Sequence, residues 1–192
     1  MYVLNGQKIL NPGRAWTDAN GIKHPANWAT AWPSNLKESM GIVDVQESPK
    51  PDSKFYFISS QNLDGTWDAV LKNLDDVDEV DADGNPILDD DGNQLVTLGL
   101  KSQYIAATKQ TANSLLESSD WQVVAKYERD RDIDANVATY RAAVITKCGE
   151  IEAAITACAN MDAFRAMFET PVDSDGNATG NPPISDWPVL GD

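Results

Sequence analysis

Residue types that commonly carry catalysis are scarce in this chain of 192 amino acids. The single histidine, His24, precedes Pro25 in a turn-rich stretch where a packing role is the simpler interpretation. No serine lies in a Gly-x-Ser-x-Gly turn, no cysteine has the spacing of a metal ligand, and no glycine-rich loop leads from a strand into a helix. An active site needs several converging groups with adjusted pKa values. We therefore expect a binding protein that is not an enzyme and needs no cofactor.

Cysteine is nearly absent as well, with Cys148 and Cys158 as the only two. They lie on one predicted helix, where a rise of 1.5 Å per residue separates them by about 15 Å and prevents a disulfide within that helix. They have the character of small buried apolar residues in a reducing compartment. We expect synthesis in a cytoplasm.

Basic residues number 15 against 30 acidic residues, which gives a net charge of −15. A field of this sign repels phosphate backbones and anionic lipids, so binding to nucleic acids or membrane surfaces is disfavoured. Long apolar runs are also missing: no window approaches the roughly 18 apolar residues of a membrane span, and residues 1–8 do not open a signal peptide. A solvated acidic surface is the simplest interpretation of the charge, and a basic partner is the alternative.

The first part of the chain is rich in strand and turn signals. The pair Asn5-Gly6 predicts a hairpin within residues 1–10. Residues 42–47 and 54–59 are typical of two strands joined by an exposed turn at residues 48–52. Between these features lies a stretch that we interpret as an irregular loop pinned by large rings, with Trp16, Trp28 and Trp32 between prolines.

Residues 67–74 fit either a short helix or the end of a strand. An acidic region follows them. Residues 75–93 hold nine carboxylates and no Lys or Arg. A Glu-x-Asp-x-Asp-Gly series that begins at Glu79 partly matches a calcium-binding EF-hand loop. Three features disfavour a calcium site: Pro86 within the loop, the absence of flanking helices and the absence of a final Glu. Asp-Gly-Asn occurs twice, eight residues apart, which indicates two tight turns of a hairpin and no metal site.

The hydrophobic period changes to that of helices after Gly99. Apolar and small residues predict one amphipathic helix over residues 101–116 and a second over about 134–160, with a further piece through Phe168 compatible with the pattern. Arg141 falls largely off the second stripe, on the solvated side. The apolar stripe of the second helix consists of Val137, Tyr140, Val144, Cys148, Ile151, Ile155 and Cys158.

The two helices are expected to form an antiparallel pair. They are joined through Asp120-Trp121 and a charged linker at residues 126–132. Either Asp132 or Asp134 can cap the start of the second helix, because a short carboxylate accepts from free N–H groups of the first turn.

The predicted fold class is α+β, with a β-rich N-terminal half that contains hairpins and a helical C-terminal half. Four regions follow from these patterns: a Trp-rich β region at residues 1–62, an acidic hairpin region at 63–100, a helical region at 101–168 and an extended tail at 169–192. The tail lacks periodicity and has Trp187 as its candidate docking residue.

A short motif in the helical region resembles a known family. A helix ends in Leu115-Leu116, Ser119-Asp120-Trp121 follows, and after a polar segment Tyr140-Arg141 opens a helix. This order is similar to the C-terminal region of phage tail fibre assembly chaperones, over residues 110–145. The family usually places an arginine soon after the tryptophan and a Leu-Arg pair just after Tyr-Arg. Here residues 122–126 contain no arginine, and Val144-Ile145 follows Arg141 without one.

A second resemblance lies near the N-terminus. The pattern Asp-x-x-Gly-x-x-His-Pro-x-x-Trp runs from Asp18 to Trp28, followed by a short helix at residues 36–40 and Gly41-Ile42. It resembles the start of many phage tail accessory proteins. The two resemblances imply a protein that acts in phage tail assembly in the host cytoplasm. It would bind a tail fibre or a neighbouring tail protein, with several copies of it in one assembly. Retention of the protein in the virion tail and its absence from the virion are both compatible with the resemblances.

The resemblance and the helical pattern indicate Trp121, Tyr140 and Arg141 as partner-binding residues. Buried aromatic side chains carry much of the energy at such interfaces, and Arg141 would reach a carboxylate or a backbone carbonyl of the partner. The alternative is that Trp121 packs inside and wedges the two helices apart at their turn.

Two other binding functions stay open. The chain fits a permanent structural component of the phage tail, baseplate or fibre junction. The tryptophan cluster of residues 14–33 fits either a carbohydrate platform or, more simply, an internal core.

Overall fold

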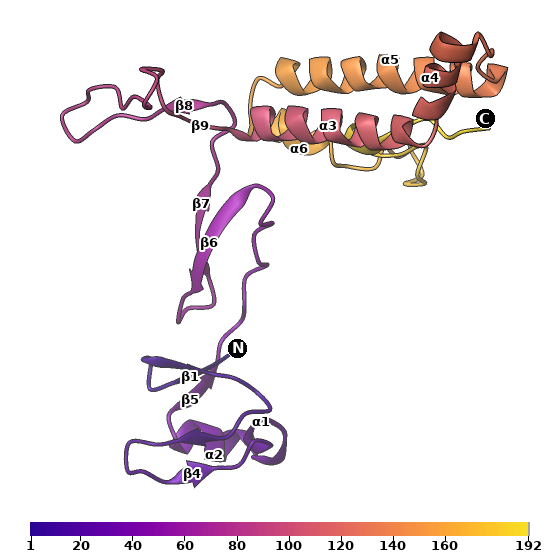
Figure 1. Cartoon of the computed structure of the whole chain (residues 1–192). Helices are drawn as coiled ribbons and strands as arrows, with labels where there is room; N and C mark the ends of the chain where they lie inside the picture. The colour runs from indigo at the N-terminus through magenta and orange to yellow at the C-terminus, as the bar shows by residue number, and fades with distance from the viewer. Residues whose placement is uncertain (192) are drawn as a thin grey trace. The chain divides into compact units, whose positions relative to one another are not determined.

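The computed structural model describes residues 1–191 and has an α+β fold. The chain forms two compact units, Met1–Lys72 (unit 1) and Asn73–Asp192 (unit 2), so the division falls inside the predicted acidic hairpin region (Figure 1). Unit 1 contains seven basic and seven acidic residues, whereas unit 2 contains eight basic and 23 acidic residues. The whole net charge of the protein therefore belongs to unit 2.

Unit 1 begins with the predicted hairpin. Strands β1 (Tyr2–Leu4) and β2 (Lys8–Leu10) pair antiparallel around Asn5 and Gly6, which have φ angles of 50° and 63°. Strand β5 (Ile42–Asp44) pairs with the other edge of β1, which gives the order β2-β1-β5. The predicted strand at residues 42–47 is thus confirmed in part, but its partner is β1 and not the next strand along the chain.

The tryptophan-rich stretch is more regular than predicted. It contains strands β3 (Trp16–Thr17) and β4 (Lys23–His24) and helices α1 (Trp28–Ala31) and α2 (Ser34–Ser39). The expectation of an irregular loop was therefore wrong, because short strand pairing and two helical turns satisfy backbone groups between the rings. The rings form the core of unit 1, with Leu10, Trp16, Trp28 and Ile42 buried together.

Strands β6 (Tyr56–Gln61) and β7 (Trp67–Leu71) form a separate antiparallel ribbon. The segment at residues 67–74, which fitted a helix or a strand, begins as a strand. The turn between β6 and β7 contains Gly65 at φ 85°, and a Cβ atom at this position would lie 2.2 Å from the backbone oxygen of Gln46.

This close approach predicts that alanine at Gly65 destabilises the protein much more than alanine at Gly84, although the two glycines have nearly equal φ angles. Gly84 has φ 84°, but a Cβ atom there would meet nothing within 4 Å. Gly65→Ala should lower the free energy of unfolding by about 2 to 4 kcal/mol through strain and displacement of the Gln46 backbone. Gly84→Ala should lower it by about 1 kcal/mol, from its φ angle alone. Urea unfolding of both variants measures the difference, and equal losses would contradict the close approach.

Unit 2 opens with the acidic hairpin, which we define as residues 77–97. Strands β8 (Val77–Asp78) and β9 (Val96–Thr97) pair at its base. Isolated bridges join Val80 to Pro86 and Leu88 to Gln94, so the two Asp-Gly-Asn segments form tight turns and the predicted hairpin is confirmed.

Each turn of the acidic hairpin is held by one aspartate. The Oδ1 atom of Asp81 accepts from the N–H groups of Asp83 and Asn85, and Asp89 accepts from Asp91 and Asn93 in the same way. These hydrogen bonds lower the pKa of both carboxyl groups, and the bond from the asparagine N–H has the largest effect in each turn. Both carboxylates are thus used within the backbone turns.

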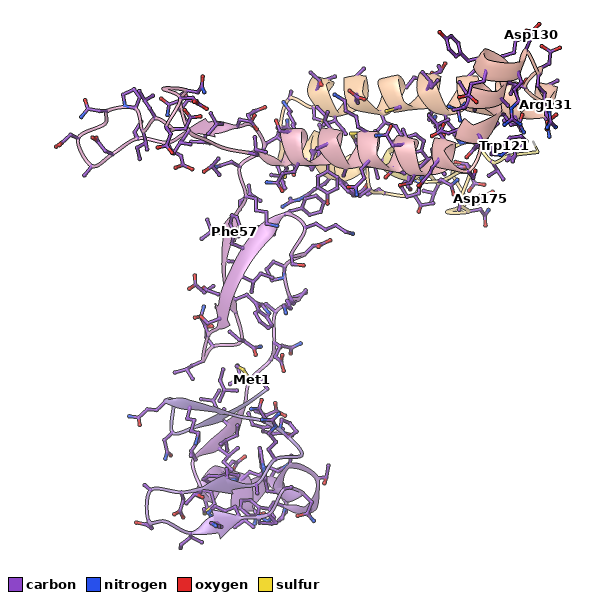
Figure 2. All side chains as sticks on the ribbon, in the orientation of Figure 1. Met1, Phe57, Trp121, Asp130, Arg131 and Asp175 are labelled. Atoms are coloured by element: carbon purple, nitrogen blue, oxygen red, sulfur yellow. The ribbon has the colours of Figure 1, made fainter. Side chains whose placement is uncertain are left out.

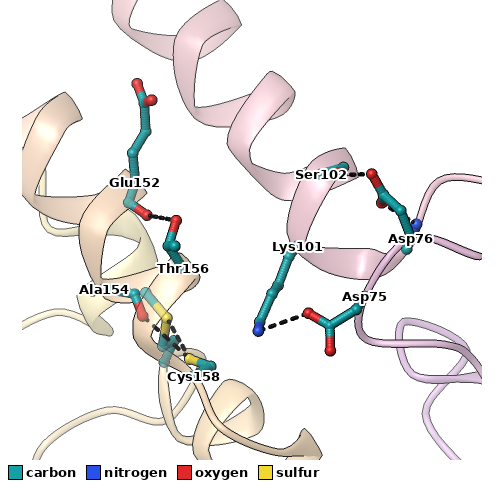
Figure 3. A network of polar contacts seen from close by, with 10 residues as sticks. Asp75, Asp76, Lys101, Ser102, Glu152, Ala154, Thr156 and Cys158 are labelled. Atoms are coloured by element: carbon teal, nitrogen blue, oxygen red, sulfur yellow. Dashed lines mark hydrogen bonds and ion pairs between the residues drawn. The ribbon is translucent and has the colours of Figure 1, made fainter.

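Two aspartates anchor the base of the acidic hairpin to helix α3 (Leu100–Glu117), as Figure 3 shows. Asp75 pairs with Lys101 at 2.8 Å. The two oxygens of Asp76 accept from the N–H of Gly99 and the hydroxyl of Ser102, both at 2.8 Å. The hairpin is therefore attached to the first turn of the helix.

The helices of unit 2 are α3, α4 (Asp120–Arg129), α5 (Ala135–Ala157) and α6 (Met161–Ala166). Helices α3 and α5 are antiparallel, because Arg141 near the start of α5 contacts Leu116 near the end of α3, while Lys109 pairs with Glu152 further along α5. The buried stripe of α5 confirms the predicted pattern and includes Val137, Val144, Ile151 and Ile155. The predicted linker at residues 126–132 is in part helical, since α4 extends to Arg129.

The segment after α6 does not stay extended. A bridge joins Val172 to Ala178 around a third turn of the same type, and a short 3-10 helix, η1 (Pro183–Ser185), follows. Asp186 pairs with Lys147 of α5 at 2.8 Å, and Trp187 lines a shallow cleft beside it. The tail thus folds back onto α5; its last residue, Asp192, lies outside the described residues.

Two further sequence predictions concern cysteines and membranes. Both Cys148 and Cys158 are free, and Cys158 is buried with its Sγ atom 3.6 Å from the Sδ atom of Met167. Within residues 1–191, no helix is both long enough and apolar enough to cross a bilayer.

Candidate partner-binding site

Helix α4 presents apolar side chains to solvent. Trp121 is 52% exposed and Tyr127 is 94% exposed, and Val123 and Val124 between them are exposed as well. We call these four residues the α4 apolar face. In a helix of 3.6 residues per turn they occupy about half of the circumference. A surface helix normally turns such a face towards the core, so the orientation of α4 requires a specific cause.

The cause is a pair of hydrogen bonds on the opposite side of the helix, between Gln122 and Asp134. Gln122 is buried, its Nε2 atom donates to Oδ2 of Asp134 at 2.9 Å, and its Oε1 atom accepts from the Asp134 N–H at 2.8 Å. Breaking this pair would leave the buried amide of Gln122 without partners. Gln122 therefore holds the polar side of α4 against the start of α5 and leaves the apolar side free.

Asp134 differs from its predicted role. It occupies the N-cap position of α5, but its side chain makes no capping hydrogen bond because it is bound to Gln122. Gln122 itself was missed by sequence reasoning. The available indication was an amide on the side of the helix opposite to its two valines.

Arg141 binds groups of its own chain. Its Nη1 atom donates to the carbonyl of Leu116 at 2.8 Å and to Oγ of Ser119 at 2.7 Å, and it lies 2.8 Å from Oδ1 of Asp120. The predicted carbonyl and carboxylate partners are thus present, but they come from the corner between α3 and α4. Arg141 positions α4 and does not project from the surface.

Tyr140 lies apart from the α4 apolar face. It is half-buried and lines a cleft of about 370 Å³ with Ala135, Thr139 and the C-terminal Pro188 and Val189. Of the three predicted partner-binding residues, Trp121 alone belongs to the α4 apolar face. Its exposure does not fit the alternative in which it packs inside as a wedge.

Charged residues border the C-terminal end of α4. Figure 2 shows Trp121, Asp130 and Arg131 at this end of unit 2. Lys126 pairs with Asp132 at 2.7 Å and with Asp130 at 3.2 Å, and these carboxylates raise the pKa of Lys126. The guanidinium of Arg131 lies over the Trp121 ring, 5.4 Å from its centroid, as in a cation–π contact.

The structure offers less to the other functions considered. Among residues 1–191, no three His, Cys, Asp or Glu side chains are grouped so as to hold a metal ion. In the tryptophan cluster, Trp28 is fully buried and Trp16 nearly so. Because a sugar stacks on an accessible ring face, these two rings serve as a core and do not form a carbohydrate platform.

The α4 apolar face is the arrangement of this chain best suited to binding. It combines two accessible aromatic rings, two valines and an arginine whose guanidinium lies over one of the rings. Comparison of the chain with models of protein families, with curated proteins and with solved structures finds no match.

Proposed function

We propose that this protein is a phage tail fibre assembly chaperone-like protein that binds a fibre or a neighbouring tail protein through the α4 apolar face. The single observation that carries the proposal is the outward orientation of Trp121, Val123, Val124 and Tyr127. The binding takes place in the host cytoplasm during assembly, with several copies of the protein in one assembly. Retention in the virion tail as a permanent component is the second form of the same proposal.

The contacts around Arg141 give the resemblance a physical meaning. The motif residues Ser119 and Asp120 lie next to Trp121 in the sequence, and both contact Arg141 of the second motif. The order of residues in the motif thus corresponds to one corner, in which Arg141 fixes the helix that carries Trp121. This arrangement supports a role for the motif in presenting Trp121.

The size of the α4 apolar face also supports a binding role. An aromatic side chain buries roughly 150 to 250 Å² at an interface. Together with the two valines, the half-exposed Trp121 and the fully accessible Tyr127 offer a few hundred Å², which is the size of surface patches that are often functional. Aromatic residues at the centre of such a patch carry much of the binding energy.

Trp121→Ala tests the proposal. The variant should melt within about 2 °C of the unchanged protein, since the ring is half-exposed and a surface change alters stability by less than about 0.5 kcal/mol. Co-purification with co-expressed tail fibre protein should be lost, because a central aromatic anchor contributes about 2 kcal/mol or more to binding.

Phe57→Ala is the matched control, because Phe57 is an exposed aromatic residue of unit 1. It should leave fibre recovery unchanged. Normal recovery with Trp121→Ala and Tyr127→Ala would exclude the α4 apolar face. Mass spectrometry of purified virions separates the two forms of the proposal: a chaperone is absent from the particle, whereas a structural component is present in fixed copy number.

A further inference from the structure

The charged side chains on the exposed side of α4 are carboxylates. We propose that the partner segment that binds the α4 apolar face is a helix whose apolar stripe is bordered by lysine and arginine side chains. This inference deepens the proposed function, on which it rests for the assignment of the α4 apolar face as the partner site. It states the chemistry that the tail fibre or the neighbouring tail protein presents to this face.

Helical spacing places one carboxylate within the α4 apolar face. Glu128 follows Trp121 by seven residues and Val124 by four, so the three side chains share one side of α4. Glu128 is exposed and lies in no ion pair within residues 1–191. Its charge is therefore available to a partner that covers Trp121 and Val124.

Asp120 adds a second carboxylate on the exposed side of α4. It precedes Val124 by four residues and Tyr127 by seven, which places it on the same side as these two residues. Asp120 pairs with Arg141 at 2.8 Å, yet its side chain remains 58% exposed. A partner that covers Val124 and Tyr127 thus meets a carboxylate there as well.

The basic residues of α4 lie on the opposite side of the helix. Lys126 and Arg129 follow Gln122 by four and seven residues, so they share the side of Gln122 and not that of Trp121. Lys126 is also paired with two aspartates of the segment that follows α4. Neither cation offsets the carboxylates of the exposed side.

Arg131 is the basic residue that approaches the α4 apolar face, because its guanidinium lies over the Trp121 ring (Figure 2). This single cation leaves the surroundings of the face acidic. Residues 120–134 contain five acidic and three basic residues, and unit 2 contains 23 acidic and eight basic residues. A surface with this balance of charge attracts a basic partner and repels an acidic one.

The shape of the α4 apolar face favours a helix as its partner. The face is one side of a helix of 10 residues, which is about 15 Å long at 1.5 Å per residue. The side chains of such a helix form ridges, which pack into the grooves of a second helix. Apolar residues at every third or fourth position of the partner would cover the two rings and two valines. Lysine or arginine at the border of that stripe would reach the carboxylates of Glu128 and Asp120.

Binding of synthetic peptides to the purified full chain tests the proposal without any fibre protein. The basic probe is a fluorescein-labelled helical peptide of about 18 residues, with a leucine stripe and lysine at its polar positions. The acidic probe has glutamate in place of each lysine. Fluorescence anisotropy should give a dissociation constant of about 10 to 100 μM for the basic peptide at about 0.05 M salt. The acidic peptide should bind at least about tenfold more weakly.

Two substitutions locate the contact on α4. Trp121→Ala should weaken binding of the basic peptide about tenfold or more, because it removes the aromatic anchor. Glu128→Lys should weaken it about fivefold. At about 0.5 M salt the effect of Glu128→Lys should become smaller, because exposed charges are screened. Circular dichroism should show an intact fold in both variants.

Asp91→Lys is the matched control for Glu128→Lys. It makes the same change of charge at an exposed position of the acidic hairpin. The acidic hairpin is attached to the first turn of α3, whereas α4 follows the last turn. Helix α3 has 18 residues and therefore separates the two by about 27 Å. Asp91→Lys should leave binding of the basic peptide within about twofold of its value for the unchanged protein.

Four results would overturn the proposal. They are the absence of binding of the basic peptide up to about 1 mM protein, tighter binding of the acidic peptide, unchanged binding by Glu128→Lys, and an equal loss with Asp91→Lys. The last result would indicate a general attraction between a basic peptide and an acidic protein.

Fibre recovery separates this inference from the proposed function. Loss of fibre recovery with Trp121→Ala, together with tighter binding of the acidic peptide, would retain the proposed function and reject this inference. Normal fibre recovery with Trp121→Ala and Tyr127→Ala would reject the proposed function. Binding of the basic peptide that depends on Glu128 and Trp121 would then still support the stated chemistry of the α4 apolar face.

Discussion

Trp28→Ala is expected to lower the free energy of unfolding of unit 1 by about 3 to 5 kcal/mol while the helices of unit 2 keep their stability. Trp28 is fully buried. Its ring centroid lies 5.1 Å from the centroid of the Tyr2 ring, and its Nε1 atom donates to the carbonyl of Arg14 at 3.0 Å. Removing such a ring leaves a cavity and costs about 3 to 5 kcal/mol. Small domains have a total stability of only about 5 to 15 kcal/mol, so this loss is a large fraction of it.

Near-ultraviolet circular dichroism should report the loss, while the signal at 222 nm should persist because α3 to α6 all belong to unit 2. Trp32→Ala is the matched control. Trp32 is half-buried and packs against the same core from its edge, so its removal should cost clearly less. Equal stability of the Trp28 and Trp32 variants would contradict the central place of Trp28.

Arg141→Ala is expected to destabilise unit 2 by about 2 to 3 kcal/mol and to weaken fibre binding indirectly. The change removes a charged donor from the carbonyl of Leu116 and from the buried Ser119, and hydrogen bonds to charged groups contribute about 1.5 to 3 kcal/mol. The ion pair with Asp120 adds little, because that carboxylate is 58% exposed.

This result differs from the expectation for an arginine that faces only a partner, whose removal would leave the fold unchanged. Thermal unfolding followed at 222 nm measures the effect. Arg141→Lys should restore it only in part, since an ammonium group lacks the planar fork that reaches several acceptors. Arg129→Ala serves as control, because Arg129 is exposed on α4 and its removal should change stability by less than about 0.5 kcal/mol. A normal melting temperature for Arg141→Ala would show that other contacts fix the corner.

Features that depend on a few neighbouring residues could be read from the sequence. The stripe of α5 was predictable because residues three and four apart share a side of any helix, and Val144, Ile151 and Ile155 are buried as that spacing requires. The turns at Asn5-Gly6 and at the two Asp-Gly-Asn segments were predictable because each is held by its own side chain or by a permissive φ angle.

Pairing between distant segments followed other rules. The sequence showed two neighbouring strands at residues 42–47 and 54–59, but the first pairs with β1 and the second with β7. Strand pairing depends on which edge is free when the chain collapses, and local pattern does not contain that information. The same applies to the tail, whose position depends on the pair Lys147–Asp186.

By itself, the sequence determined the fold class, the two long helices, the hairpin turns and the place of Trp121 in a motif. Only the tertiary structure decided that Trp121 faces solvent and that Arg141 faces its own chain. The physical reason is that a helix has two sides, and local pattern would turn the apolar side of α4 inward. The hydrogen bonds between the buried Gln122 and Asp134, twelve residues apart, reverse that choice and expose the candidate binding face.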